Sequence, residues 1–241
     1  MTPQPFIYRG RFAAICFDLD GVLIDTMPLH ARAWQEALRP FGRHVSRLSI
    51  YQWEGEPGAV TARVLLSHGR ASPSLKTVMT LLRDKERRFQ RLARHIRVAP
   101  KWTALLDRLA RRGIRLGLVT GTSSREVRRV VPKEILARFQ TIVTGDRVRR
   151  GKPHPEPYRA ALRQLCVSPG RAIVVENAPY GIRSARLTRA GLVVALATSL
   201  PKRFLREAHC ISPSITRLCA LLERLTSPFP HRYNTENRRK R

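Results

Sequence analysis

The stretch Phe12–Gly21, which reads FAAICFDLDG, joins an apolar run to two aspartates and a glycine. The run Phe12–Phe17 predicts a buried strand of a parallel sheet, because such strands are covered on both faces and are apolar throughout. Asp18 and Asp20 follow at once, although neighbouring carboxylates repel each other and resist removal from water. A compensating cation is therefore expected, and a magnesium ion that binds together with a phosphate-bearing substrate is the leading candidate.

Four further apolar runs have the length and composition of strands. They are Arg115–Val119, Thr141–Thr144, Ala172–Val175 and Leu192–Leu196. Each of these four runs is preceded by a helix-patterned segment. In chain order the segments are Lys101–Arg112, Ser123–Phe139, Pro155–Leu165 and Pro179–Ala190. Strands that alternate with helices pair in parallel, so the sequence predicts an α/β fold with a doubly wound parallel sheet.

The interval between Asp25 and Val98 breaks this alternation, because it contains no convincing strand. Its segments Pro28–Arg39 and Ser74–His95 carry apolar residues at helical spacing instead. They predict a helical cap domain inserted after the first strand, with two nearby crossings that form a hinge. The predicted organisation is a core of residues 1–25 and 98–228, a cap of residues 26–97, and a basic, disordered tail of residues 229–241.

The composition is strongly basic. The chain of 241 residues has 46 Lys and Arg against 17 Asp and Glu, a net charge of +29, and 39 of the basic residues are arginine. Such a charge attracts anionic substrates and is also compatible with nucleic-acid binding. The arginines are spread along the whole chain, however, which favours solvated helix faces over a dedicated binding patch.

Cysteine usage and hydropathy bear on the location of the protein. The four cysteines show no Cys-x-x-Cys spacing, and two of them, Cys16 and Cys166, fall in segments that we expect to be buried. This pattern fits reduced thiols in a cytoplasmic protein. No apolar run approaches the about 20 residues that a membrane-spanning helix needs, so we expect no membrane partner.

Polar residues of several kinds follow the predicted strands. Ligands of parallel α/β sheets bind at the carboxyl ends of the strands, where these residues would meet. In chain order they are Asp18, Asp20, Thr120, Gly121, Lys152, Glu176 and Asn177. Carboxylates and an amide suit a hard cation, and hydroxyls, backbone N–H groups and a lysine suit a phosphate. The sequence therefore predicts a combined metal and phosphate site.

Four short motifs carry a resemblance to a known family. They are Asp18-Leu19-Asp20-Gly21, Thr120 after its strand, Lys152 in Gly-Lys-Pro, and Glu176-Asn177 followed by Gly181 and Ala190-Gly191. In this order, each at a strand end, they resemble the haloacid dehalogenase (HAD) superfamily over roughly Ala14 to Leu196. The chain is most similar to the phosphatase and beta-phosphoglucomutase-like group, which Asp25, His30 and Trp34 also fit. The resemblance implies a HAD Rossmann-like core with a helical cap in the first insertion position.

The resemblance also implies a chemistry, that of a HAD-like phosphoric monoester hydrolase. Such an enzyme would use Mg²⁺ and hydrolyse a small phosphorylated metabolite, with sugar phosphates among the candidates. Asp18 would be the nucleophile that forms an aspartyl-phosphate, and Asp20 the acid and base. Thr120 and Gly121 would bind the phosphate, and Lys152 would neutralise its charge. Two carboxyls two residues apart on a strand point to the same face, which suits joint work on one phosphoryl group.

The implied metal ligands are Asp18, the backbone carbonyl of Asp20, and the pair Glu176 and Asn177. Asn177 stands where the family commonly has an aspartate, and it offers a carbonyl oxygen without a charge. Both members of the pair therefore stay candidates for direct contact with the metal. His30 is a candidate for proton handling or substrate binding from the cap, and simple packing is an equal alternative.

Other functions stay open at this stage. A beta-phosphoglucomutase-like mutase would need a cap arginine for a second phosphate, but none occurs between Gly55 and Arg63, which disfavours it. A polyanion- or nucleic-acid-binding protein on a HAD scaffold would rest on the net charge alone. The presence of Asp20 argues against a dehalogenase, because that reaction does not need a second aspartate. The segment Trp53–Gly58 is either a substrate-specificity loop or a simple connector between helices. The oligomeric state does not follow from the sequence.

Overall fold

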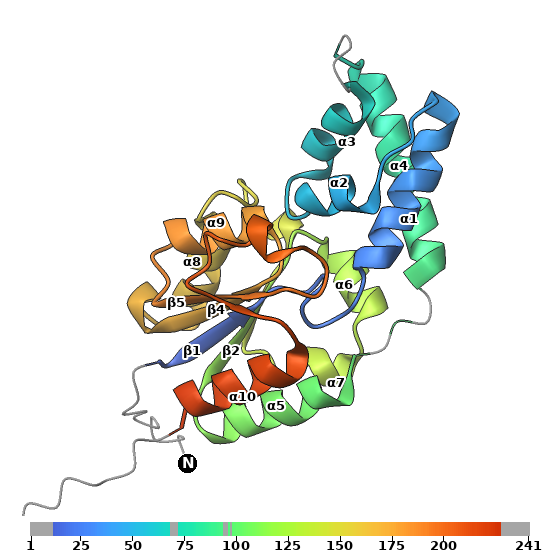
Figure 1. Ribbon diagram of the computed structural model, residues 1–241. Coiled ribbons are helices and arrows are strands. Elements are labelled where there is room, and N and C mark those ends of the chain that lie inside the picture. The colour runs from blue at the N-terminus through green and yellow to red at the C-terminus, as the bar shows by residue number, and fades with distance from the viewer. Residues whose placement is uncertain (1–11, 68–71, 94–95, 97, 228–241) are drawn as a thin grey trace, which may run out of the picture.

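Six parallel strands in the order β3-β2-β1-β4-β5-β6 form one sheet in the computed structural model (Figure 1). The structure describes residues 12–67, 72–93, 96 and 98–227. The strands are β1 (Ala14–Phe17), β2 (Arg115–Val119), β3 (Thr141–Val143), β4 (Ala172–Glu176), β5 (Leu192–Leu196) and β6 (Cys210–Ser212). The chain builds outward from β1 to β3 and then crosses to β4 on the other side of β1. This reversal of strand order beside β1 is the place where such sheets bind ligands.

Helices cover both faces of the sheet. In Figure 1, α5 and α10 lie against one face, and α8 and α9 lie against the other. The side chains of α5 show why: Trp102, Leu105, Leu106 and Leu109 repeat at helical spacing and are fully buried. Helix α5 (Pro100–Arg111) precedes β2. The helices after β2 are α6 (Ser124–Val130), α7 (Lys133–Leu136), α8 (Glu156–Gln164), α9 (Pro179–Leu187) and α10 (Ile215–Leu225).

A group of helices between β1 and β2 lies together at one end of the molecule (Figure 1). They are α1 (Met27–Leu38), α2 (Arg47–Gln52), α3 (Gly58–Ser67) and α4 (Leu75–Leu92). Ser74 caps α4, because its hydroxyl accepts a hydrogen bond from the Thr77 N–H at 3.1 Å. α1 and α4 pack through Ala33 and Phe89, both almost fully buried. This arrangement agrees with an inserted helical cap, whose boundaries at residues 26 and 97 stay a prediction.

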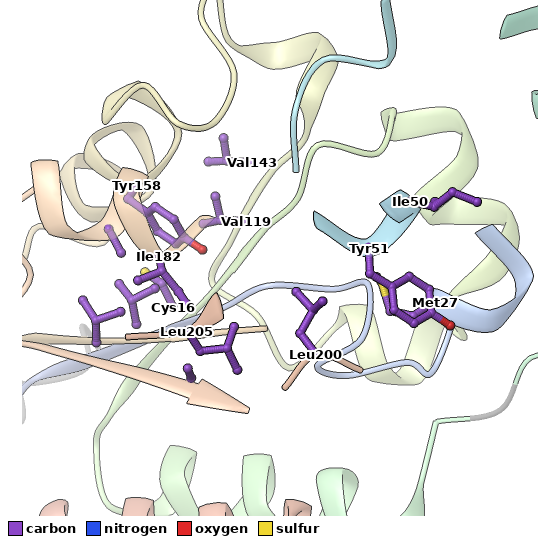
Figure 2. Close-up of a cluster of buried hydrophobic side chains, with 14 of the residues drawn as sticks. Cys16, Met27, Ile50, Tyr51, Val119, Val143, Tyr158, Ile182, Leu200 and Leu205 are labelled. Carbon is purple, nitrogen blue, oxygen red and sulfur yellow. The ribbon is translucent and has the colours of Figure 1, made fainter. Parts of the chain in front are cut away.

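Buried side chains connect the sheet to this cap. Figure 2 shows Cys16 and Val119 of the sheet beside Tyr158 of α8, and Ile50 and Tyr51 of α2 beside Met27 of α1. Leu200 lies between the two groups, and all of these residues belong to one apolar cluster. The cap and the core therefore pack against each other through a shared apolar cluster in this conformation.

The α/β fold with a doubly wound parallel sheet is confirmed, and the differences from the sequence-based expectations are local. The predicted helix Ser123–Phe139 is two helices, because Pro132 between them has no N–H to donate and an extended ψ of 139°. Strand β6 was not predicted, since it has only three residues and lies at the sheet edge. The predicted burial of Cys166 is wrong: α8 has ended, and the residue turns outward with a φ of 52°.

Two further expectations concern the ends and the surface of the chain. The predicted tail, residues 229–241, lies outside the described residues. Within the described part of the chain, every helix is too short or too polar to pass through a bilayer.

Candidate active site

The turn after β1 places both aspartates at the carboxyl end of the central strand. The Asp18 N–H donates to the Val175 carbonyl at 2.9 Å, which continues the pairing of β1 with β4 by one residue. The chain then curls back, and the Leu19 carbonyl accepts from the N–H groups of residues 22, 23 and 24. Gly21 permits this turn, since its φ of 80° is unfavourable for other residues. Asp18 and Asp20 are 6% and 7% exposed.

Lys152 lies between two buried carboxylates. Its ammonium donates to Asp18 Oδ1 and to Glu176 Oε1, each at 2.6 Å, and to the Val119 carbonyl at 3.2 Å. Tyr158 donates a further hydrogen bond to Glu176 Oε1 at 2.6 Å. Burial alone would lower the pKa of Lys152, but the two carboxylates raise it, so this lysine stays charged.

Two carboxylates share this one ammonium, so the cluster is short of positive charge. Burial and then the Glu176 carboxylate raise the pKa of Asp18, although Lys152 opposes the change. Because burial and a like charge raise this pKa, the ionised form of Asp18 is destabilised in the folded protein. A second cation beside Asp18 would restore the balance.

Asp20 has a different environment, rich in hydrogen-bond donors. Its Oδ1 accepts from the Thr26 hydroxyl at 2.6 Å, and its Oδ2 accepts from the hydroxyls of Thr122 at 2.8 Å and Thr120 at 3.3 Å. His30 Nε2 lies 3.4 Å from Oδ1. Burial would raise the pKa of Asp20, but these contacts, led by His30, lower it overall. In this arrangement Asp20 is ionised, and its contacts stabilise the carboxylate form.

His30 both packs and contacts the site, so its two alternative roles are not exclusive. Its ring stacks on Phe89 of α4, with centroids 3.9 Å apart and an interplanar angle of 11°. The residue is 5% exposed. A helix of the cap thus fixes the ring that approaches Asp20.

Glu176 and Asn177 at the end of β4 are not equivalent. Glu176 Oε1 accepts from Lys152 and Tyr158, and Oε2 accepts from the Asn177 N–H at 3.1 Å. The Asn177 side chain is 1% exposed, and neither its oxygen nor its nitrogen has a hydrogen-bond partner within the described residues. A buried amide without a partner is costly, unless an ion or ligand completes it. Asn177 is therefore better placed than Glu176 to contact a metal directly.

The donor set around this position fits a hard cation. Nowhere in residues 12–67, 72–93, 96 and 98–227 do three or more His, Cys, Asp or Glu side chains group in a way that could hold a metal. Oxygen groups of mixed kind lie at the ends of the neighbouring strands β1 and β4 instead: the Asp18 carboxylate and the unpartnered Asn177 amide, with the Asp20 backbone carbonyl as the third ligand that the resemblance implies. Mg²⁺ accepts such a set and commonly keeps several waters.

Gly181 makes room for Glu176. A Cβ at this position would lie 1.9 Å from Glu176 Oε1, and Glu176 is held in place by Lys152 and Tyr158. We expect Gly181→Ala to lower the free energy of unfolding by about 1–3 kcal/mol, as overpacking does, and to reduce activity. The gain of up to about 1 kcal/mol that alanine brings to a helix is too small to offset this. Thermal unfolding measures the difference.

Gly170→Ala is the matched control, because a Cβ there meets nothing within 4 Å. We expect its stability to stay within about 0.5 kcal/mol of the parent. Equal unfolding temperatures for the two variants would show that Glu176 is not held in place.

A cavity of about 1130 Å³ lies between the core and the cap. All eight residues predicted for the site line it: Asp18, Asp20, His30, Thr120, Gly121, Lys152, Glu176 and Asn177. The segment Trp53–Gly58 also lines it, and Trp53 stacks on Tyr180 of α9 with centroids 5.8 Å apart. A cap loop thus closes over the site, which favours the specificity loop over a simple connector.

The sequence did not point to every residue of this site. Thr122 follows Thr120 by two residues after β2, and this spacing could have identified it. Thr26 and Tyr158 carry no local signal, since one directly precedes α1 and the other is a regular buried position of α8. Only the tertiary structure brings them to Asp20 and Glu176.

Comparisons with known proteins agree with this architecture. The sequence model of the haloacid dehalogenase-like hydrolase family matches residues 15–197. Protein CbbY of Cereibacter sphaeroides is 32% identical over 191 residues, which cover 72% of this chain and 79% of that protein. The phosphorylated carbohydrates phosphatase of Thermotoga maritima is 29% identical over 175 residues, which cover 72% of this chain and 80% of that protein. The crystal structure of CbbY from Rhodobacter sphaeroides in complex with phosphate matches with a TM-score of 0.71 and 28% identity, over 86% of this chain and 96% of that one.

Proposed function

The chain belongs to the haloacid dehalogenase-like hydrolases, and from this premise we propose that it is a magnesium-dependent phosphatase of a small phosphorylated metabolite. Its class, a HAD-like phosphoric monoester hydrolase, is confirmed by the family and by the phosphatases among its relatives. Names such as phosphorylated carbohydrates phosphatase support a sugar phosphate as the substrate. The observation that carries the proposal is the Asp18–Lys152–Glu176 cluster beside the unpartnered Asn177 amide, in the wall of one cavity.

The first chemical step takes place on Asp18. Lys152 holds Oδ1, so the other carboxylate oxygen attacks phosphorus, and the bond from phosphorus to the leaving oxygen breaks. The leaving oxygen takes a proton from Asp20. The Thr120 hydroxyl and the backbone around Gly121 receive the oxygens of the phosphoryl group, and Lys152 offsets their charge.

The second step releases phosphate. Asp20 accepts a proton from the water that attacks the aspartyl-phosphate, and Asp18 leaves as a carboxylate. The contacts around Asp20 keep it ionised, which is the form that a base requires, although by lowering its pKa they also make it a weaker base. Two of them, from Thr26 and His30, come from the cap side of the site, so movement of the cap would loosen them and let Asp20 hold the proton that the first step needs.

Mg²⁺ would be held by Asp18, the backbone carbonyl of Asp20 and the amide oxygen of Asn177. When bound, it supplies the positive charge that Lys152 alone does not provide to two carboxylates and a phosphate. Glu176, whose oxygens already accept from Lys152, Tyr158 and the Asn177 N–H, positions the lysine.

Asn177→Asp tests this assignment of the metal ligands. A carboxylate about 4 Å from a divalent ion gains about 2 kcal/mol in water, so the variant should need at least about 10-fold less Mg²⁺ for half-maximal activity. Without the metal, the extra buried charge should lower the unfolding temperature, and added Mg²⁺ should raise it more than in the parent. Titration of activity and of unfolding temperature with Mg²⁺ gives both values. If neither curve moves, Asn177 does not contact the metal.

A phosphosugar mutase is the second candidate, and one observation favours it. Arg83 and Arg87 of α4 line the cavity, so cap arginines are available for a second phosphate even though none occurs between Gly55 and Arg63. Release of phosphate from sugar phosphates, compared with interconversion of their isomers, separates the two activities.

The deciding experiment is a panel of phosphorylated metabolites assayed for phosphate release with and without Mg²⁺. The proposal expects release that stops when the metal is chelated and returns when Mg²⁺ is restored. Absence of release across sugar, polyol and carboxylate-bearing phosphates would contradict it.

A further inference from the structure

Glu126 is a carboxyl group in the cavity wall that the proposed mechanism does not use. It lies in the first turn of α6, on the core side, and lines the same cavity as Asp20. Its Oε1 is buried and forms no hydrogen bond with any described residue. A buried acceptor without a partner calls for an explanation, such as a ligand that completes it.

Helix capping does not account for Glu126. Ser123 and Glu126 have the spacing of a capping box, in which the glutamate side chain returns to the N–H of the serine. Ser123 does accept from the Glu126 N–H at 3.4 Å. The return bond is not among the hydrogen bonds of the described chain, and Oε1 stays without a partner. The carboxyl group is therefore not committed to its own helix.

The groups that face Glu126 come from the cap and from the turn after β1. Glu86 and Lys85 belong to α4, and Asp20 lies on the core side; the Glu86 carboxyl is close enough to share a hydrogen bond with Glu126, while Glu126 Oε1 stays without a partner among the described residues. Gln90 binds Glu86 Oε1 at 3.0 Å, and the Lys85 ammonium lies 5.0 Å from the centre of the Phe89 ring. The subsite beyond Asp20 is thus polar, with hydrogen-bonding groups on two sides.

We propose that Glu126 contacts the substrate and selects a hydroxyl-bearing leaving group, by a hydrogen bond between its carboxyl and one of those hydroxyls. This inference rests on the proposed phosphatase function and narrows its substrates to sugar and polyol phosphates. Because Asp20 serves the leaving oxygen, the carbon chain of the leaving group extends into the part of the cavity that Glu126 lines. An alkyl chain at this position would leave the buried Oε1 of Glu126 without a partner, and such sites discriminate strongly against analogues that lack the hydroxyl.

The charge state of Glu126 supports this role. Burial first, and then the nearby Glu86 carboxylate, raise the pKa of Glu126 to about 8, although Lys85 opposes the change. At neutral pH the group is therefore mostly protonated. A neutral carboxyl both donates and accepts a hydrogen bond, and it does not repel a phosphorylated substrate.

The test compares matched substrates and matched variants. Sorbitol 6-phosphate and glycerol 3-phosphate are compared with hexyl phosphate and propyl phosphate, which keep the chain length and lack the hydroxyls. In Glu126→Leu, kcat/KM on the hydroxylated pair should fall about 10-fold or more, mainly through KM, and by much less on the alkyl pair. Glu126→Gln should keep the preference, because its amide both donates and accepts. Glu134→Leu, at an exposed position of α7, controls for the loss of a carboxylate and should change neither.

Each result decides the matter. An unchanged preference in Glu126→Leu, with normal thermal unfolding, would overturn the inference and leave the phosphatase function intact. An equal loss in Glu126→Gln would also overturn it, since a neutral hydrogen-bonding group would then not suffice. A parent enzyme that hydrolyses both pairs equally would overturn it too. A parent enzyme that releases no phosphate from any of them in Mg²⁺ would overturn the proposed function itself.

Discussion

Replacing Asp18 by asparagine is expected to abolish phosphate release, with a loss in kcat on the order of 10⁴-fold or more. The amide keeps the shape of the side chain but is a poor nucleophile, so the aspartyl-phosphate does not form. The fold should tolerate the change. Burial and the Glu176 carboxylate raise the pKa of Asp18, which means that its charge opposes folding, and the neutral amide removes that charge. The unfolding temperature should therefore equal or exceed that of the parent.

Asp107→Asn is the matched control for this experiment. Asp107 forms an ion pair with Arg138 at 2.7 Å on the surface of α5, away from the cavity. Its replacement should leave kcat unchanged and cost at most about 1 kcal/mol of stability. Full turnover in Asp18→Asn, assayed in Mg²⁺ beside this control, would show that phosphoryl transfer does not pass through Asp18.

The fold follows from the sequence because its central strands are apolar on both faces. Residues 14–17 and 172–175 are completely buried, so a continuous apolar run was a reliable signal for β1 and β4. The edge strand β6 gave no such signal, since two of its three residues are only partly buried. Cap helices α2 and α3 were also not predicted as separate elements, because short helices depend on packing against their neighbours more than on their own periodicity.

Site residues that lie at the ends of strands could be predicted from the sequence. Site residues whose role depends on contacts between distant segments could not. Asp18 follows β1, Lys152 lies between β3 and α8, and Glu176 ends β4, yet each belongs to a recognisable motif. The oxygens of Glu176 accept hydrogen bonds, one of them from Tyr158, whereas the side-chain oxygen of Asn177 accepts none within the described residues. No local sequence pattern reveals this difference. Glu126 shows the difference most clearly. Its spacing from Ser123 is that of a helix capping box, whereas its surroundings in the cavity favour contact with a ligand.

The net charge of +29 is far larger than the ion pairs of the described residues offset. Several arginines form surface ion pairs, such as Arg183 with Glu207 at 2.7 Å, but acidic partners are far fewer than basic groups. No described feature adds to the hypothesis of polyanion or nucleic-acid binding, which stays a prediction. Salt-sensitive binding of DNA by Asp18→Asn would support it independently of catalysis.

Replacing Lys152 by methionine should impair both stability and activity. The ammonium lies 2.6 Å from Asp18 Oδ1 and 2.6 Å from Glu176 Oε1, and all three side chains are less than a tenth exposed. Removing one partner of a buried ion pair costs about 3–5 kcal/mol, because the remaining charge has no compensation. With a loss of about 2–4 °C per kcal/mol in a chain of this size, thermal unfolding would resolve the change easily. In kcat we expect a loss of about 10²-fold or more, since the charge on the phosphoryl group is no longer offset.

The pH dependence of Lys152→Met distinguishes this cause from a simple packing defect. Without the ammonium, which opposes the rise, the pKa of the buried Asp18 carboxyl lies further above that of the unfolded chain. Folding then takes up protons, so the stability of the variant rises as the pH falls, and its deficit relative to the parent shrinks. A packing defect would give the same deficit at every pH. Lys101→Met, at an exposed position, should change stability by at most about 0.5 kcal/mol at any pH. A deficit in Lys152→Met that does not depend on pH would mean that the ammonium does not compensate the two carboxylates.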